Sequence, residues 1–337
     1  MFILGTNLKL NTMPFSIPSF KEKVLAEDIM VTLEESYSVI APIWVPLQVQ
    51  WMNGVYGAFK DYEKFMIIMH LLSKTFNFYS ENFVRLSYEE FFNQKQIEIE
   101  KYNIIDIAKS LKIPRETARR KVKELEAIGY LKRIQKKIVI DGGGAWPSIQ
   151  PIKTINRLSR FFSTFSKILY EKKIILELTS SEELTKTIKE YFSHVWKLYY
   201  DLQIPMLLNN KRLHNDLETF HIWGVCVVNQ FINSNKNDNN HLSKEYFLEK
   251  YIFKGHEELS GVNALSISDI SGIPRATVIR KLNKLIKKKF LKIDSKKHYA
   301  TSGFHKKELL VMQKQNFIRL SKFAASIYNL NIHQKIK

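Results

Sequence analysis

The chain carries the same basic segment twice, and this duplication constrains its fold more than any other feature. When residues 103–132 are aligned without gaps to residues 263–292, 11 of the 30 pairs are identical. Shorter similarities lie on both sides, such as Asp61-Tyr-Glu-Lys-Phe65 with Asp216-Leu-Glu-Thr-Phe220. The offset drifts from 155 to 162 residues along the chain, as small loop insertions would cause. The similarity therefore predicts one structural unit that is present twice.

The repeat predicts how the 337 residues are organised. We expect an N-terminal segment (1–24), a first repeat (25–172), a connection (173–179) and a second repeat (180–331). In each repeat, apolar periodicity predicts helices before and after the basic segment. These helices are expected at about 25–42, 60–76 and 153–171, and at about 181–202, 216–232 and 305–328. Ser180-Ser-Glu-Glu183 predicts a capping box at the start of the second repeat.

The positive charge of the chain gathers on the two basic segments. The formal net charge is +19. Residues 101–137 contain 12 Lys and Arg against 4 Asp and Glu, and residues 263–297 contain 10 against 2. Charge focused in this way indicates a polyanionic partner that meets these two places.

Within the basic segment of the first repeat, the pattern predicts two helices and a hairpin. Ile104, Ile107 and Leu111 fall on one face of a short helix. Pro114 suits the first turn of a second helix, and Gly129 suits its C-terminal end. Two short strands are expected at 130–134 and 138–141, around basic residues. The second repeat predicts the same order, with helices at 265–271 and 274–288 and strands at 290–293 and 298–301.

Helix, turn, helix and hairpin, in that order, form a winged helix-turn-helix, and this sequence resembles bacterial transcription regulators of that class. The spacing Arg-Glu-Thr-x-x-Arg is similar to the recognition helix of the Crp/Fnr regulators. The resemblance implies that Arg115, Glu116 and Arg120 contact base edges and that Thr117 contacts a phosphate. The helices around the basic segments resemble the MarR arrangement, in which such helices form the dimer interface.

In the second repeat the resemblance implies the same roles for Arg275, Arg280 and Thr277. Ala276 stands where the first repeat has Glu116, so the preferred half-site should differ. Lysines at the hairpin tips are expected to reach neighbouring phosphates. The complete set expected at DNA is Arg115, Glu116, Thr117, Arg119, Arg120, Lys123, Lys136, Lys137, Arg275, Thr277, Arg280, Lys281, Lys284, Lys296 and Lys297.

These features predict a mainly α protein in which two tandem winged helix-turn-helix modules form an intramolecular pseudo-dimer. The expected function is a transcriptional regulator that reads an asymmetric site on double-stranded DNA. Two alternatives stay open: a plasmid-type replication initiator, which also joins two winged helices, and a scaffold whose winged helices bind proteins. A further homodimer of two chains is also open.

Other features of the sequence support few additional functions. We find no residues that suggest an enzyme, and we expect no cofactor or metal. Cys226 is expected to be a buried apolar residue rather than a redox sensor. No signal peptide or membrane span is expected, which favours a cytoplasmic, nucleoid-associated protein. Aromatic side chains are expected mainly in the core, with a cavity among them as a place for a small hydrophobic effector: Phe76, Phe78, Tyr79, Phe83, Tyr88, Phe91, Phe92, Trp196, Tyr199 and Tyr200.

Overall fold

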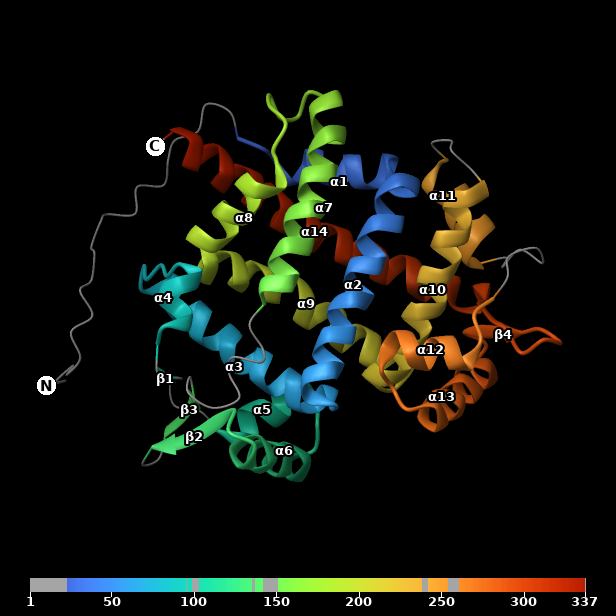
Figure 1. Cartoon of the computed structure of the whole chain (residues 1–337), viewed down its shortest axis with the longest axis horizontal. Helices are drawn as coiled ribbons and strands as arrows, with labels where there is room; N and C mark the ends of the chain where they lie inside the picture. The colour runs from blue at the N-terminus through green and yellow to red at the C-terminus, as the bar shows by residue number, and fades with distance from the viewer. Residues whose placement is uncertain are drawn as a thin grey trace, which may run out of the picture.

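The computed structural model describes residues 23–94, 96–98, 103–134, 137–141, 151–237, 242–253 and 261–336. These residues are mainly helical and include two small antiparallel sheets (Figure 1). The predicted mainly α class is therefore confirmed. Residues 1–22 of the predicted N-terminal segment lie outside the described residues. No helix among the described residues has both the length and the apolar character needed to cross a bilayer.

The two repeats contain corresponding elements in the same order. The first repeat contains α1 (Ala26–Glu35), α2 (Tyr37–Phe59), α3 (Tyr62–Glu81), α4 (Tyr88–Phe92), β1 (Gln96–Glu98), α5 (Ile104–Leu111), α6 (Arg115–Ala127), β2 (Leu131–Ile134), β3 (Lys137–Asp141) and α7 (Ile152–Glu171). The second contains α8 (Ser181–Glu190), α9 (Phe192–His214), α10 (Leu217–Asn237), α11 (Lys244–Leu248), the π-helix η2 (Glu249–Phe253), α12 (Ala264–Ser271), α13 (Arg275–Lys287), β4 (Leu291–Ile293), β5 (Tyr299–Thr301), the 3-10 helix η3 (Gly303–His305) and α14 (Lys306–Ile336). Five pairs of corresponding helices have equal lengths: α1 and α8 have 10 residues, α2 and α9 have 23, α4 and α11 have 5, α5 and α12 have 8, and α6 and α13 have 13.

Side-chain caps explain several residues that the repeats share. Asp61 begins α3, where its Oδ1 accepts hydrogen bonds from the backbone N–H groups of Glu63 and Lys64 at 2.8 and 3.2 Å. Asp216 does the same for α10, accepting from the N–H of Thr219 at 2.8 Å. Such caps satisfy backbone donors that have no partner inside the helix. The predicted capping box at Ser180 is confirmed.

The sequence prediction was wrong about the ends of the first helices. The helix expected at about 25–42 breaks at Ser36, and α2 then continues to Phe59. The helix expected at about 181–202 likewise breaks at Tyr191, and α9 then continues to His214. Pro42 and Pro46 lie inside α2, where the missing N–H groups and ring clashes disfavour a helix locally. The apolar face of α2 is nevertheless buried, and α2 packs against α10. Burial of this face outweighs the local cost, which periodicity along the chain does not reveal.

The helices of each repeat pack against those of the other in a reciprocal way. The first helix of each repeat lies on the last helix of the other, so α1 contacts α14 and α8 contacts α7. In the same manner α2 contacts α10, and α9 contacts α3. Aromatic pairs follow this exchange: Tyr37 lies 5.8 Å from Phe247, and Phe192 lies 5.3 Å from Phe91, between ring centroids. The central helices α2, α3, α9 and α10 fill the middle of the molecule (Figure 1).

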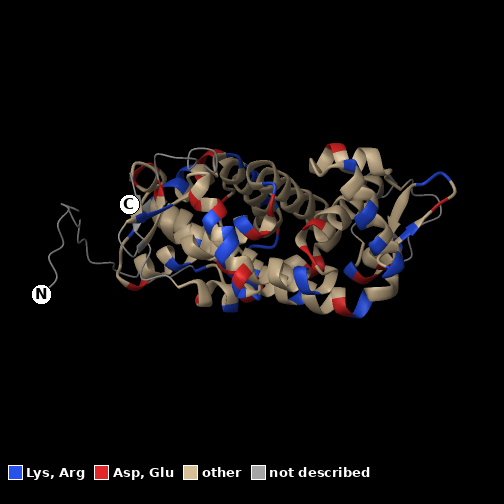
Figure 2. Cartoon of the chain, turned by 90° about the horizontal axis from the view of Figure 1, so that it is seen from below, with Lys and Arg blue, Asp and Glu red and all other residues tan. Residues whose placement is uncertain are grey.

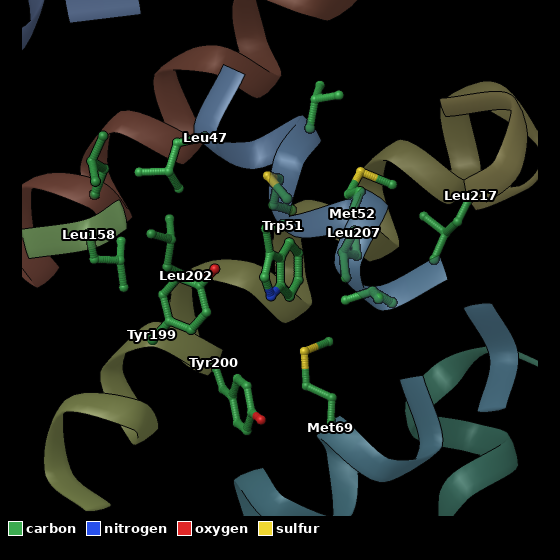
Figure 3. Packing of buried hydrophobic residues seen from close by; sticks show 14 of the residues in the cluster. Leu47, Trp51, Met52, Met69, Leu158, Tyr199, Tyr200, Leu202, Leu207 and Leu217 are labelled. Atoms are coloured by element: carbon green, nitrogen blue, oxygen red, sulfur yellow. The ribbon is translucent and has the colours of Figure 1, made fainter. Parts of the chain in front are cut away.

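The two repeats consequently share one hydrophobic core. Figure 3 shows Trp51 and Met52 of α2 facing Met69 of α3 and Tyr199, Leu202 and Leu207 of α9. The rings of Trp51 and Tyr199 lie edge to face, with centroids 5.8 Å apart. Neither repeat could bury these side chains alone.

A small polar group is buried where the two repeats meet. The Nδ1 of His221 in α10 lies 2.7 Å from the hydroxyl oxygen of Tyr62, and its Nε2 lies 2.6 Å from Oδ1 of Asn53. These bonds fit a neutral imidazole that accepts from Tyr62 and donates to Asn53. Burial lowers the pKa of His221 to about 3, so the ring stays neutral near pH 7.

Candidate nucleic-acid interface

The helix pairs α5–α6 and α12–α13 are joined by turns of the same construction. The first turn places Lys112 in the left-handed region with φ 51°, and the second places Gly272 there with φ 68°. The following residues, Ile113 and Ile273, are buried and anchor each turn in the core. The turn thereby sets the direction in which α6 or α13 leaves the body.

Helices α6 and α13 bury the same face and expose the same face. Ala118, Val122 and Leu125 are fully buried in α6, as are Val278, Leu282 and Leu285 in α13. The exposed positions also correspond over the first six residues of each helix, at Arg115–Arg120 and at Arg275–Arg280. The outer surfaces of both helices are therefore available to a partner.

The 11 identical pairs of the basic segments divide into two groups. Seven have structural reasons, since they cap or begin a helix, fill the core or form an ion pair: Asn103, Ile107, Pro114, Ile113, Lys121, Leu125 and Leu131 with their counterparts. The other four, Arg115, Thr117, Arg120 and Lys132, are exposed or half-buried, and so are their counterparts. Packing does not explain why these four residues are the same in both repeats.

The arginines of α6 are held by carboxylates of the same helix. Arg119 donates from Nε and Nη2 to one oxygen of Glu116, at 2.9 and 2.7 Å. Arg120 donates from Nη1 to Glu124 at 3.1 Å. Because these pairs are exposed, each contributes little to stability and can be exchanged for another partner. Arg115, at the start of the helix, forms no ion pair with any described residue.

The outer surface of α13 carries cations without such carboxylates. The helix contains no Asp or Glu. Arg275, Arg280 and Lys284 are exposed, and none of them forms an ion pair within the part of the chain that the structure describes. The second basic helix therefore presents a more positive surface than the first.

Lys281 requires a correction, because the sequence placed it among the DNA-contacting residues. Its side chain is 6% exposed, and its Nζ lies 2.6 Å from Asp216 and 3.3 Å from Glu218. The corresponding Lys121 lies 2.6 Å from Asp61. These ion pairs attach each basic helix to the N-terminus of α3 or α10, so Lys281 holds the helix in place instead of contacting a partner.

The hairpins lie beside the basic helices. The order of the first sheet is β1-β3-β2, in which β3 pairs antiparallel with both neighbours. The sequence prediction missed β1, which is three residues long and has no clear alternation. In the second repeat a single bridge between Val262 and Tyr299 takes the place of β1 next to the β4–β5 pair. The two hairpins point away from each other at opposite ends of the molecule (Figure 1).

The lysines expected at DNA include two at the tip of each hairpin. Lys136 lies outside the described residues, and of Lys137 only the backbone is described, at the start of β3. Lys296 and Lys297 are exposed in the turn between β4 and β5. Figure 2 marks the Lys and Arg positions in blue on the ribbon, and these positions are spread along the molecule and include the tip of the hairpin at its right-hand end.

Most of the other residues that the sequence singled out lie in the core, but Phe78 and Phe83 are exposed, by 40% and 79%. Cys226 is fully buried, and burial raises the pKa of its thiol to about 12, so it stays protonated near pH 7. Phe76 and Phe91 are buried and pack on Phe192, as the core interpretation predicted. Among the described residues, no group of three or more His, Cys, Asp or Glu side chains is placed to hold a metal ion.

The basic surfaces of α6 and α13, flanked by two hairpins, are thus the best candidate for a functional site. The reasons are the exposed arginines that both repeats retain and the absence of carboxylates from α13. No protein-family model, curated protein or solved structure matches this chain.

Proposed function

We propose that the chain is a sequence-specific DNA-binding transcriptional regulator that reads an asymmetric duplex site with α6 and α13. The observation that carries this proposal is the retention of exposed Arg115 and Arg120, and of Arg275 and Arg280, at the same positions of two helices. Arginine donates two hydrogen bonds to the O6 and N7 of guanine in the major groove, and this is the commonest specific contact to DNA. The surrounding lysines would add phosphate contacts that depend on salt.

Each basic helix has the surroundings that a winged helix-turn-helix requires. A short helix, a tight turn and the basic helix are followed by a hairpin, and in the first repeat β1 pairs with β3, the second strand of that hairpin. In such units the second helix enters the major groove and the first crosses the backbone. The reciprocal packing of the two repeats is what an intramolecular pseudo-dimer would need, because it resembles a two-fold interface.

The differences between α6 and α13 support an asymmetric target. Glu116 can accept a hydrogen bond from the N4 of cytosine, whereas Ala276 cannot. Ile279, which is 40% exposed, stands where the first repeat has Arg119. An exposed apolar side chain at this place suits contact with the methyl group of thymine. The two halves of the site should therefore differ in sequence.

A retention experiment tests the function directly. The purified full chain is incubated with sheared DNA from its own organism at near-physiological salt, and the retained DNA is sequenced. We expect one non-palindromic motif in front of a small number of genes. Arrays of direct repeats at an origin would instead favour a replication initiator, and the absence of DNA retention would favour a protein scaffold.

Two lysines of α13, one turn apart, should affect different properties when each is replaced by methionine: Lys281 the stability of the fold, and Lys284 the binding of DNA. Lys281→Met removes the cation from Asp216 and Glu218, so the free energy of unfolding should fall by about 2 kcal/mol. This is less than for a fully buried pair, since both carboxylates are partly exposed. Lys284→Met should change stability by less than about 0.5 kcal/mol, but lower the salt dependence of DNA binding by about 0.9 in log–log slope. Urea titration and binding at several salt concentrations measure the two quantities, and equal destabilisation by both variants would contradict the placement of Lys281.

A further inference from the structure

An apolar cavity of about 190 Å³ lies between α2, α9, α10 and α14. This volume is larger than the cavity of about 150 Å³ that takes up benzene in an engineered protein. Aromatic side chains supply much of the wall, including Trp44, Trp223 and Phe317. Met52 and Leu202, which also line it, appear in Figure 3. The cavity is distinct from the aromatic cluster around Phe76 that the sequence suggested for an effector.

The corresponding place in the other repeat is filled by large side chains. Helices α2 and α9 have equal lengths and correspond at an offset of 155 residues, so Ala41 corresponds to Trp196 and Val45 to Tyr200. Trp196 and Tyr200 are buried, with 4% and 7% of their surface exposed. Ala41 and Val45 instead line the cavity. The second repeat therefore accommodates bulky residues at these positions, whereas the first repeat has small ones.

Three amide side chains that line this cavity have polar atoms without a hydrogen-bond partner among the described residues. Gln48 is 8% exposed, and neither of its amide atoms makes a hydrogen bond with a described residue. The same holds for Oε1 of Gln313 and Oδ1 of Asn316, both of which come from α14 and line the cavity. Buried polar atoms nearly always have a hydrogen-bond partner, so a group of exceptions in one place needs an explanation.

Comparison with Gln203, the counterpart of Gln48, shows that an unpartnered amide alone does not make a cavity. It is also buried without a described partner. It lies, however, on the same helix as the bulky Trp196 and Tyr200 and does not line the cavity. Only Gln48 combines the unpartnered amide with open volume and with two further amides of α14.

The lining also defines the chemistry of an occupant. None of the described lining residues is Asp, Glu, Lys, Arg or His. Tyr37 lines the cavity as well, and burial raises the pKa of its hydroxyl, which stays neutral. A charged ligand would lose its hydration here without gaining a counter-charge.

We propose that this cavity binds a small uncharged ring compound that carries one hydrogen-bonding group. The ring lies among Trp44, Trp223 and Phe317, and the polar group meets the amides of Gln48, Gln313 and Asn316. Helix α10 lines the cavity and also packs against α12 and α13. If the function proposed above holds, occupancy is therefore felt at the second reading helix.

Titration of the full chain with benzamide, without DNA, tests the site. Trp44 and Trp223 line the cavity, so tryptophan fluorescence reports binding, and calorimetry measures it independently. We expect saturable binding at least tenfold tighter than that of toluene, which lacks the polar group, and of benzoate, which is charged. Absence of saturation, or equal binding of benzoate, would overturn the proposal.

Variants locate the binding in the cavity. Ala41→Trp introduces the side chain found at the corresponding position of the other repeat and should weaken benzamide binding at least tenfold. Gln48→Leu should weaken benzamide but not toluene, and it keeps the proposal testable if Ala41→Trp fails to fold. Gln203→Leu is the matched control and should leave binding unchanged. Unaltered binding in both Ala41→Trp and Gln48→Leu would refute the site. Because the assay contains no DNA, this result would leave the proposed DNA-binding function untested and separate.

Discussion

Replacing Arg115 or Arg275 by alanine should impair opposite halves of the same DNA footprint. Each arginine begins one basic helix, is exposed and makes no ion pair with a described residue. Loss of a bidentate contact to guanine costs about 1–3 kcal/mol, which corresponds to roughly 5- to 150-fold weaker binding. Footprinting of each variant on the selected site would show which half loses protection.

The control for this experiment is an exposed lysine away from both basic helices. Lys314 in α14 is exposed, and Lys314→Ala should leave the footprint and the affinity unchanged. If Arg115→Ala and Arg275→Ala removed protection from the same half of a symmetric footprint, the chain would bind as a conventional homodimer. The intramolecular pseudo-dimer would then be rejected.

The free energy of unfolding should decrease steeply as the pH falls from about 6.5 towards 4. Burial lowers the pKa of His221 to about 3 and is the main reason why the pKa values of His70 and His214 fall to about 4. An unfolded histidine has a pKa of about 6.5, so below this pH the unfolded chain binds protons that the folded chain excludes. Each buried histidine therefore reduces stability by about 1.4 kcal/mol for every pH unit below 6.5, down to its folded pKa.

His221→Gln isolates one of these contributions. Glutamine does not titrate, and its amide can donate to Asn53 and accept from Tyr62 as the imidazole does. Urea unfolding between pH 7 and 4.5 should show a slope that is smaller by about one proton in this variant. An unchanged slope would mean that His221 takes up a proton as readily in the folded chain as in the unfolded chain.

Carboxylates such as Asp216 affect stability over a lower pH range. Burial raises the pKa of Asp216, but hydrogen bonds from Lys281 and Thr219 lower it by more, so the stabilisation by this carboxylate is lost only below about pH 4.

Several local features could be predicted from the sequence because they depend on neighbours along the chain. Asn103, Pro114 and Gly129 mark helix boundaries through caps and backbone angles, and the structure places Gly129 at φ 81° as a helix end requires. The capping box at Ser180 is another local signal. The exposed faces of α6 and α13 follow from helical periodicity, so the arginines expected at their surfaces are exposed.

The path of α2 and the role of Lys281 could not be predicted in this way. Apolar periodicity predicted that the first helix ends near position 42. In the structure α2 continues through Pro42 and Pro46, because its apolar face is buried against α10. Lys281 looks like any basic residue of an exposed helix until Asp216, 65 positions earlier, comes within 2.6 Å. Local patterns contain no information about such distant partners.

The sequence by itself therefore determined that one basic helical unit occurs twice, where its helices begin, and which arginines they expose. These properties depend on hydrogen bonds and periodicity within a few turns of the chain. Only the tertiary structure decided that the first helix of each repeat packs on the last helix of the other, and that Ala41 and Gln48 meet α14 around a cavity. Apart from the contact between the neighbouring helices α7 and α8, these contacts join residues that are hundreds of positions apart. Their energy comes from burying surfaces that exist only when both repeats are folded together.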